Sequence, residues 1–85
     1  MTLITADDIV ARIQGGISGA KATVSDIGGG NHWSAVVVSP AFEGKTLVER
    51  HTMVYSTVQD RMLPKDESIH ALQLKTLTPH EAAKA

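Results

Sequence analysis

A long amphipathic pattern between Leu47 and Met62 is the strongest structural signal in the chain. Apolar side chains and one histidine recur there at spacings of three and four, at Leu47, Val48, His51, Val54, Tyr55, Val58 and Met62. This period predicts an α-helix whose apolar face covers the core. The polar side chains fall mostly on the other face, at Lys45, Glu49, Arg50, Gln59 and Asp60. Gly44 suits the turn before the helix, which should stop before Pro64.

Three shorter segments have the composition of β-strands. Residues 20–27 predict a half-exposed strand, whereas residues 32–39 are rich in valine, apolar on both faces in their second half, and predict a central strand. The loop Gly28-Gly29-Gly30-Asn31 between them predicts an antiparallel hairpin. Residues 69–77 alternate leucine with polar side chains. Because this third strand follows a helical crossover, it should run parallel to the second.

Two capping boxes indicate shorter helices near the ends of the chain. Thr5 with Asp8 begins a helix that should end near Gln14, and Thr78 with Glu81 begins a short terminal helix. The resulting order is αββαβα. This order predicts an α+β fold, with a three-stranded mixed sheet and helices packed mainly on one face.

Length and composition limit the classes of function. A chain of 85 residues has room for one core, so we expect one domain over residues 1–85. Without cysteine it can form neither a disulfide nor a thiol active site. The net charge of −1 argues against nonspecific nucleic-acid binding, which normally needs a basic excess. No apolar run approaches the length of a membrane span. The N-terminal residues already carry a helix-start pattern with Asp7 and Asp8, so we expect them to be folded protein rather than a signal or transit peptide. We therefore expect no membrane association and a cytoplasmic location, or an organellar stroma or matrix for a processed form.

The histidines are the candidates for site chemistry. His32 ends the glycine loop and His70 begins the third strand, so parallel pairing of strands two and three would bring both to one end of the sheet. Two neutral imidazoles there could bind a transition metal. The alternative is that each is an ordinary surface histidine with one hydrogen bond. His51 shares the apolar stripe and is expected to be packed, and His80 is expected to be solvated.

Other motifs give weaker indications. No Ser-His-acid set and no spaced carboxylate pair is evident, so we do not expect an enzyme. Gly16-Ile17-Ser18-Gly19 matches the GxxG of KH-type RNA-binding domains but lacks flanking lysines. Trp33, the single tryptophan, is expected to pack in the core first and to contact a partner second.

Three ordered blocks resemble the BolA family. They are VVSPAFEGK at 37–45, ERHTMVY at 49–55 and IHALQLKTLTP at 69–79, within a match that runs from about Gly30 to Glu81. The family fold is αββαβα and is related to class II KH domains, which agrees with the order inferred from the hydrophobic pattern.

The resemblance implies a non-enzymatic protein that pairs with a monothiol glutaredoxin. In such pairs a [2Fe-2S] cluster is shared, with the glutaredoxin cysteine and glutathione on one iron and two BolA residues on the other. Here those residues would be His70 of the IHAL block and His32 of the loop, which makes this a His-type member. His51 matches the family's RH motif, which is not usually a ligand. No cluster is expected in the isolated protein, which we expect to be a monomer or weak homodimer.

The resemblance also suggests a partner surface and a second function. We expect the glutaredoxin to contact residues of the glycine loop and of the motif blocks, namely Gly29, Gly30, Asn31, Trp33, Arg50 and Lys75. The task would be iron–sulfur cluster trafficking or iron and redox sensing. The alternative is a KH-like regulator of transcription that binds DNA.

Overall fold

The described part of the chain follows the predicted order of helices and strands. The structure is a computed structural model that describes residues 4–62, 65–66 and 68–84. Its elements are α1 (Ala6–Gly16), β1 (Lys21–Gly28), β2 (His32–Val38), α2 (Leu47–Val58), β3 (Ala71–Leu77) and α3 (Pro79–Lys84). Two 3₁₀-helices flank α2, namely η1 (Pro40–Phe42) and η2 (Gln59–Arg61). None of the helices in these residues is long and apolar enough to cross a membrane.

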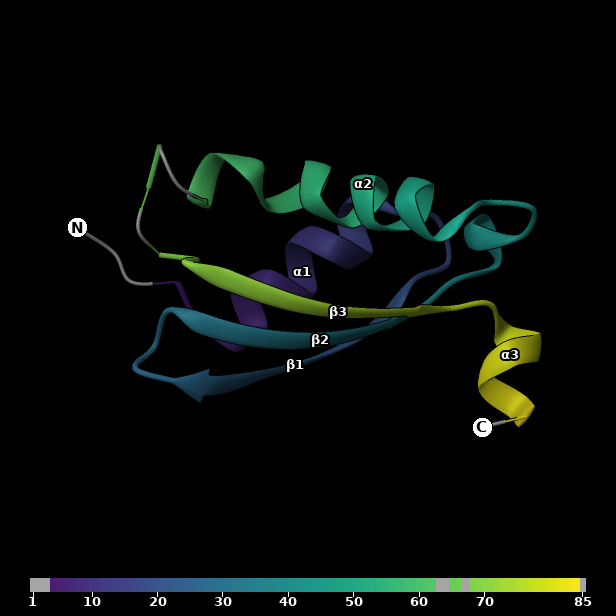
Figure 1. Ribbon diagram of the computed structural model, residues 1–85, viewed down its shortest axis with the longest axis horizontal. Helices are drawn as coiled ribbons and strands as arrows, with labels where there is room; N and C mark the ends of the chain where they lie inside the picture. Colours follow the sequence, from purple (N-terminus) through teal and green to yellow (C-terminus); the bar gives the residue numbers. More distant parts are fainter. Residues whose placement is uncertain (1–3, 63–64, 67, 85) are drawn as a thin grey trace.

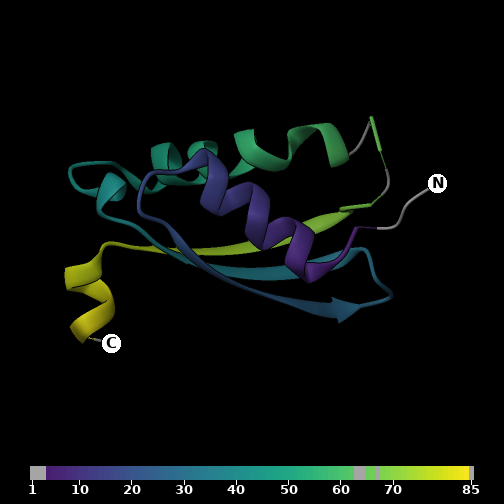
Figure 2. The same ribbon diagram turned by 180° about the vertical axis from the view of Figure 1, so that it is seen from behind.

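The sheet has the predicted topology, with β2 in the centre. The strand order is β1-β2-β3, with β1 antiparallel to β2 and β2 parallel to β3. Helices α1 and α2 lie side by side on one face of this mixed sheet, and the short α3 stands beyond the end of β3 (Figure 1). The view from behind shows the same arrangement with α1 in front (Figure 2). The expected hairpin, crossover and α+β layering are therefore confirmed.

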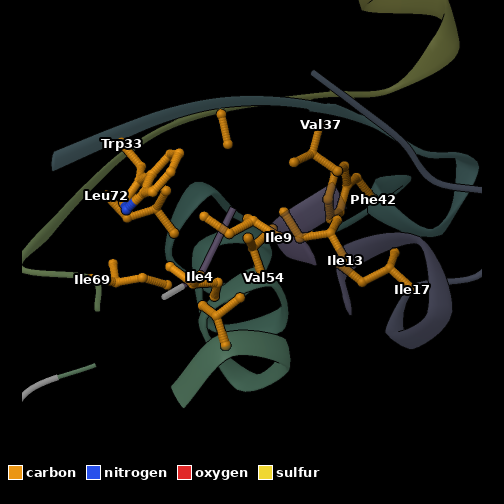
Figure 3. Packing of buried hydrophobic residues seen from close by; sticks show 12 residues of the cluster. Ile4, Ile9, Ile13, Ile17, Trp33, Val37, Phe42, Val54, Ile69 and Leu72 are labelled. Carbon is orange, nitrogen blue, oxygen red and sulfur yellow. The ribbon is translucent and has the colours of Figure 1, made fainter. Parts of the chain in front are cut away.

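One hydrophobic core lies between the two long helices and the sheet. Its buried members come from the helices, the sheet and the segments between them, and are Ile4, Ile9, Ile13, Ile17, Trp33, Ala35, Val37, Phe42, Val54, Val58, Ile69 and Leu72. Trp33, Ala35 and Val37 alternate along β2 because successive side chains of a strand point to opposite faces. Figure 3 shows Trp33 and Phe42 at opposite ends of this core.

Side-chain capping fixes where the helices begin. The boxes Thr5–Asp8 and Thr78–Glu81 form as predicted, each with reciprocal hydrogen bonds between side chain and backbone. A third box, in which Thr46 caps α2 and Glu49 bonds back to it, was missed in the sequence. Helix α1 continues through both glycines to Gly16, two residues beyond the predicted end.

The prediction that the apolar side chains of α2 face the core is wrong for the first turn of the helix. Leu47 and Val48 are 62% and 75% exposed, although both were expected to face the core. Val48 lies about 120° around the helix axis from Val54, since each residue turns about 100°. Arg50, expected on the solvent face, stands instead one turn before Val54 on the inner side. Its long apolar stem explains how it fits there.

The end of the crossover also differs from the prediction. Helix α2 ends at Val58, and the chain continues as η2 rather than as a longer helix. Pro64, the expected stop signal, lies outside the described residues, as does Glu67 of the polar turn that follows. Strand β3 begins at Ala71, and Ile69 forms only a single bridge to Met62.

Candidate metal centre

Two histidines from distant parts of the sequence lie together at one end of the sheet. His32 is the first residue of β2, and His70 immediately precedes β3. Their ring centroids are 5.9 Å apart with an interplanar angle of 54°, and both residues are exposed. The expectation that both imidazoles share one sheet end is therefore confirmed, whereas their binding of a metal stays a prediction.

Backbone pairing sets the spacing of the two histidines. The parallel register places His32 opposite Ala71, the residue after His70. The carbonyl oxygen of Asn31 accepts hydrogen bonds from the N–H groups of His70 and Ala71, at 2.8 Å and 3.4 Å. Because one carbonyl joins both segments beside the histidines, the imidazoles project from a frame that is already hydrogen-bonded.

Trp33 supplies a second connection between the same two segments. Its indole Nε1–H donates to the carbonyl oxygen of Ser68 at 3.2 Å. The side chain is only 4% exposed, and Trp33 pairs with Leu72 of β3 at this end of the core (Figure 3). The expectation that Trp33 packs in the core is therefore confirmed, because alternation along β2 turns it inward, and this burial leaves little of its surface for a partner.

A polar cluster holds the segment that leads to His70. The carboxylate of Asp66 accepts from the N–H of Ser68 at 2.7 Å and from its hydroxyl at 2.6 Å. Arg61 donates to Asp66 at 3.1 Å and to the Ser68 hydroxyl at 2.9 Å. The pKa of Asp66 is lowered, first by the Ser68 hydroxyl, then by the Ser68 N–H, and further by the charge of Arg61.

The glycine loop is held by an aspartate that the sequence analysis did not single out. One oxygen of Asp26 accepts from the N–H groups of Gly28 and Gly30, at 2.9 Å and 3.3 Å. Gly29 and Gly30 have φ of 68° and 77°, which glycine adopts without strain. The signal in the sequence was Asp-x-Gly, because aspartate commonly bonds to the N–H two residues on. The expected partner residues Gly29 and Gly30 are exposed, and Asn31 is half-buried.

The donor set suits half of a metal centre. Within residues 4–62, 65–66 and 68–84, no group of three or more His, Cys, Asp or Glu side chains is arranged to hold a metal ion. Two imidazoles on one tetrahedral ion have ring centroids about 5 Å apart, given metal–nitrogen bonds near 2 Å. The separation of 5.9 Å between His32 and His70 is close to this value. The spacing of the pair is therefore compatible with two ligand positions on one ion, and the described residues supply no third ligand of this kind.

Arg50 lies away from the histidines, near the carboxyl end of β3. It donates to Glu81 at 2.7 Å and to the carbonyl of Thr76 at 3.4 Å, and its side chain is only 13% exposed. Thr76 follows His70 by six positions, which corresponds to a distance of about 20 Å along an extended strand. The hydrogen bond from Arg50, followed by that from the Thr78 N–H, lowers the pKa of Glu81 to about 2. Arg50 thus ties α3 to α2 and does not share a surface with the histidine pair.

The other singled-out residues take separate positions. Lys75 is exposed on β3, opposite Val36 of β2. His80 is exposed in α3, as expected. His51 is half-buried, and its Nε2 is buried with no hydrogen-bond partner among the described residues. Of the histidines, only His32 and His70 are brought together.

The GxxG stretch has a packing role. A Cβ on Gly16 would lie 2.6 Å from the Cγ2 of Thr57, so this glycine allows α1 to approach α2 closely. Ile17 is buried in the core, and Gly19 has a φ of 66° beside Pro40. Of the two central residues of the stretch, Ser18 is exposed, but Ile17 is turned into the core. The burial of Ile17 therefore argues against use of this stretch to clamp a nucleic-acid backbone.

Fold and site together define a small α+β domain of αββαβα order that presents a pair of exposed histidines at the end of its parallel strands. A family model for BolA-like protein matches residues 17–81. The chain therefore belongs to the BolA-like family, in agreement with the resemblance noted in its motif blocks.

Relatives and solved structures support this assignment. The chain is 35% identical over 75 residues to Protein BOLA2 of Arabidopsis thaliana, covering 86% of the chain and 76% of that protein. It is 37% identical over 54 residues to the DNA-binding transcriptional regulator BolA of Escherichia coli, covering 64% and 49%. A bolA homologue structure from Coxiella burnetii superposes with a TM-score of 0.78 at 39% identity, over 95% of this chain and 99% of that one. The share of a curated relative's own length that this chain covers differs widely, from 76% of Protein BOLA2 to 14% of the SufE-like protein 1 of Arabidopsis thaliana.

Proposed function

We propose that this protein is a non-enzymatic adaptor that pairs with a monothiol glutaredoxin. In this proposal it contributes His32 and His70 to a [2Fe-2S] cluster shared between the two proteins. The task would be delivery of the cluster or sensing of iron and redox state. Membership of the BolA-like family makes this the first function to consider.

The observation that carries the proposal is the exposed, incomplete pair of imidazoles. The rings of His32 and His70 lie 5.9 Å apart, and the described residues supply no third ligand beside them. The sequence contains no cysteine, so thiolate ligands would have to come from the partner. Two imidazoles in place of two thiolates raise the reduction potential of a bound cluster and make its ligation depend on pH.

Cluster assembly with purified components tests the proposal. The protein is mixed with a monothiol glutaredoxin, glutathione, iron and sulfide, and visible absorption and circular dichroism follow the shared cluster. His32→Ala and His70→Ala should each shift the spectrum or abolish the mixed species. His80→Ala, an exposed histidine in α3, is the matched control and should behave as wild type. Unchanged spectra in both ligand variants would refute the assignment of these histidines.

A second candidate function is DNA binding. The relative from Escherichia coli is named a DNA-binding transcriptional regulator, which favours this reading. The net charge of −1 and the burial of Ile17 in the GxxG stretch weigh against it. Fluorescence anisotropy with duplex DNA and single-stranded RNA at two salt concentrations would separate the candidates. Micromolar affinity with a steep loss at the higher salt would favour the regulator.

A further inference from the structure

The chain approaches His70 through a segment that strand pairing does not hold. Between η2 and β3, the only ladder contact within the described residues is the single bridge from Met62 to Ile69. The backbone of this segment is also held where the N–H of Ile69 donates to the Arg61 carbonyl at 3.0 Å and the N–H of His70 donates to the Asn31 carbonyl at 2.8 Å. Side chains restrain this segment further, because both Trp33 and Asp66 form hydrogen bonds with Ser68.

Trp33 and Ser68 lie near the two histidines in the sequence, so a bond between them restrains where both histidines stand. Trp33 follows His32 directly, and Ser68 precedes His70 by two residues. The hydrogen bond from the indole N–H to the Ser68 carbonyl therefore joins the two histidine-bearing segments from the core side. The bond from the His70 N–H to Asn31 joins them at the rim. These two cross-links lie two residues apart on each segment and restrain its movement relative to β2.

Asp66 orients the carbonyl that Trp33 uses. Its carboxylate takes both donors of Ser68, the N–H and the hydroxyl, while Arg61 bridges the same two side chains. The side chains of Arg61 and Asp66 are 21% and 25% exposed, so solvent competes with these bonds only in part. These bonds restrain the backbone and side chain of Ser68, the residue whose carbonyl oxygen accepts from the indole.

We infer that Trp33, Ser68 and Asp66 are positioning residues that preset the separation of the two imidazoles for a single metal centre. This inference rests on the proposed function, in which His32 and His70 act as a ligand pair. The physical gain is preorganisation, since ligands already held near their bound geometry lose less conformational entropy when the metal binds. No contact of these residues with the metal is required.

The test uses the full chain without glutaredoxin and copper(II)–iminodiacetate as the probe. This chelate leaves coordination positions that two nearby imidazoles can fill together. Electron paramagnetic resonance reports how many imidazole nitrogens bind, and a titration gives the dissociation constant. Wild type should show two nitrogens, and His32→Ala or His70→Ala should show one, with weaker binding. Equal binding by wild type and both alanine variants would overturn the inference, since no chelating pair would exist.

Two variants loosen the segment in different ways. Trp33→Phe removes the indole donor but also trims the core, so Phe42→Leu, at the opposite end of the core, is its control for lost packing. Asp66→Ala removes the acceptor of both Ser68 bonds and leaves the core intact, and its control is Asp60→Ala, which breaks the Arg12 ion pair. Trp33→Phe and Asp66→Ala should weaken copper binding roughly threefold to tenfold, as expected for about one lost hydrogen bond. Both should also reduce the two-nitrogen signal, and the controls should not.

The outcomes separate this inference from the proposed function. Wild-type affinity and a full two-nitrogen signal in both Trp33→Phe and Asp66→Ala would overturn the positioning role, even if the shared cluster assembles normally. Equal losses in the paired controls would overturn it as well, because general destabilisation would then explain them. Conversely, the copper experiments could give the expected results while no shared cluster forms with the glutaredoxin. That outcome would reject the proposed function but support the inferred geometry of the ligand pair.

Discussion

Gly16 offers a sharp test of whether the GxxG stretch serves packing or nucleic-acid binding. This residue ends α1 at the point where the helix passes α2. A methyl group placed on it would come within 2.6 Å of the Thr57 Cγ2, a distance that requires one of the helices or side chains to move. Gly16→Ala is therefore expected to destabilise the protein, although alanine is the better helix former.

The size of the effect follows from two opposing terms. Overpacking a tight contact typically costs about 1–3 kcal/mol. Replacing glycine by alanine in a helix returns up to about 1 kcal/mol, and less at a terminal position. Thr57 cannot simply rotate away, because its hydroxyl donates to the Val54 carbonyl at 2.7 Å. The net loss of unfolding free energy for Gly16→Ala should be about 1–2 kcal/mol.

Urea unfolding followed by tryptophan fluorescence measures this loss, since Trp33 is the only tryptophan and is buried. Gly15→Ala is the matched control, because nothing lies within 4 Å of its added methyl group, and it should be neutral or stabilising. Thr57→Ser removes the crowded methyl and keeps the hydroxyl. In that background Gly16→Ala should lose most of its cost, with a coupling free energy of about 1 kcal/mol or more.

The packing explanation would be refuted if Gly16→Ala matched Gly15→Ala in stability. It would also fail if Thr57→Ser left the cost of Gly16→Ala unchanged. If Gly16→Ala instead abolished RNA binding while preserving stability, the GxxG stretch would have the nucleic-acid role that its sequence suggests.

Two further predictions concern acid stability and the glycine loop. Because the pKa of Glu81 is lowered from 4.5 to about 2 by Arg50, its ion pair stabilises the fold above pH 4.5, and this contribution is lost as the pH falls toward 2. Urea unfolding between pH 5 and pH 2 should therefore show a smaller acid loss for Glu81→Gln than for wild type, and equal losses would contradict the ion pair. Asp26→Ala should raise hydrogen exchange at the Gly28 and Gly30 amides without changing the exchange of the β2 core amides. Uniformly raised exchange would indicate global destabilisation instead.

Local signals were enough to predict most of the fold. Capping boxes such as Thr5–Asp8 act within four residues, so their sequence pattern implies their structure directly. The valine-rich segment from 32 to 38 could be placed at the centre of the sheet because both of its faces are apolar. The inward position of Arg50 could not be inferred in this way, because its partners Glu81 and Thr76 come from elements far along the chain.

The candidate site shows the same division between local and distant information. The meeting of His32 and His70 followed from topology, because parallel neighbouring strands must begin at the same end of the sheet. The supporting contacts did not follow. Asp66 and Ser68 stand in a polar turn that composition alone describes as solvated. Their role depends on Trp33, more than thirty residues earlier in the chain.

A firm but incomplete ligand pair has a consequence for the affinity of the site. Two imidazoles alone hold a metal centre weakly, because half of its coordination positions remain with solvent. When a partner supplies the other ligands from a fixed distance, each half binds at the high effective concentration set by the other. In the proposed function, the frame around His32 and His70 would lower the entropic cost of gathering its own half of the ligands. Retention of a shared cluster should then depend on both proteins at once, and separating them should release it, as a protein that passes on or reports a cluster requires.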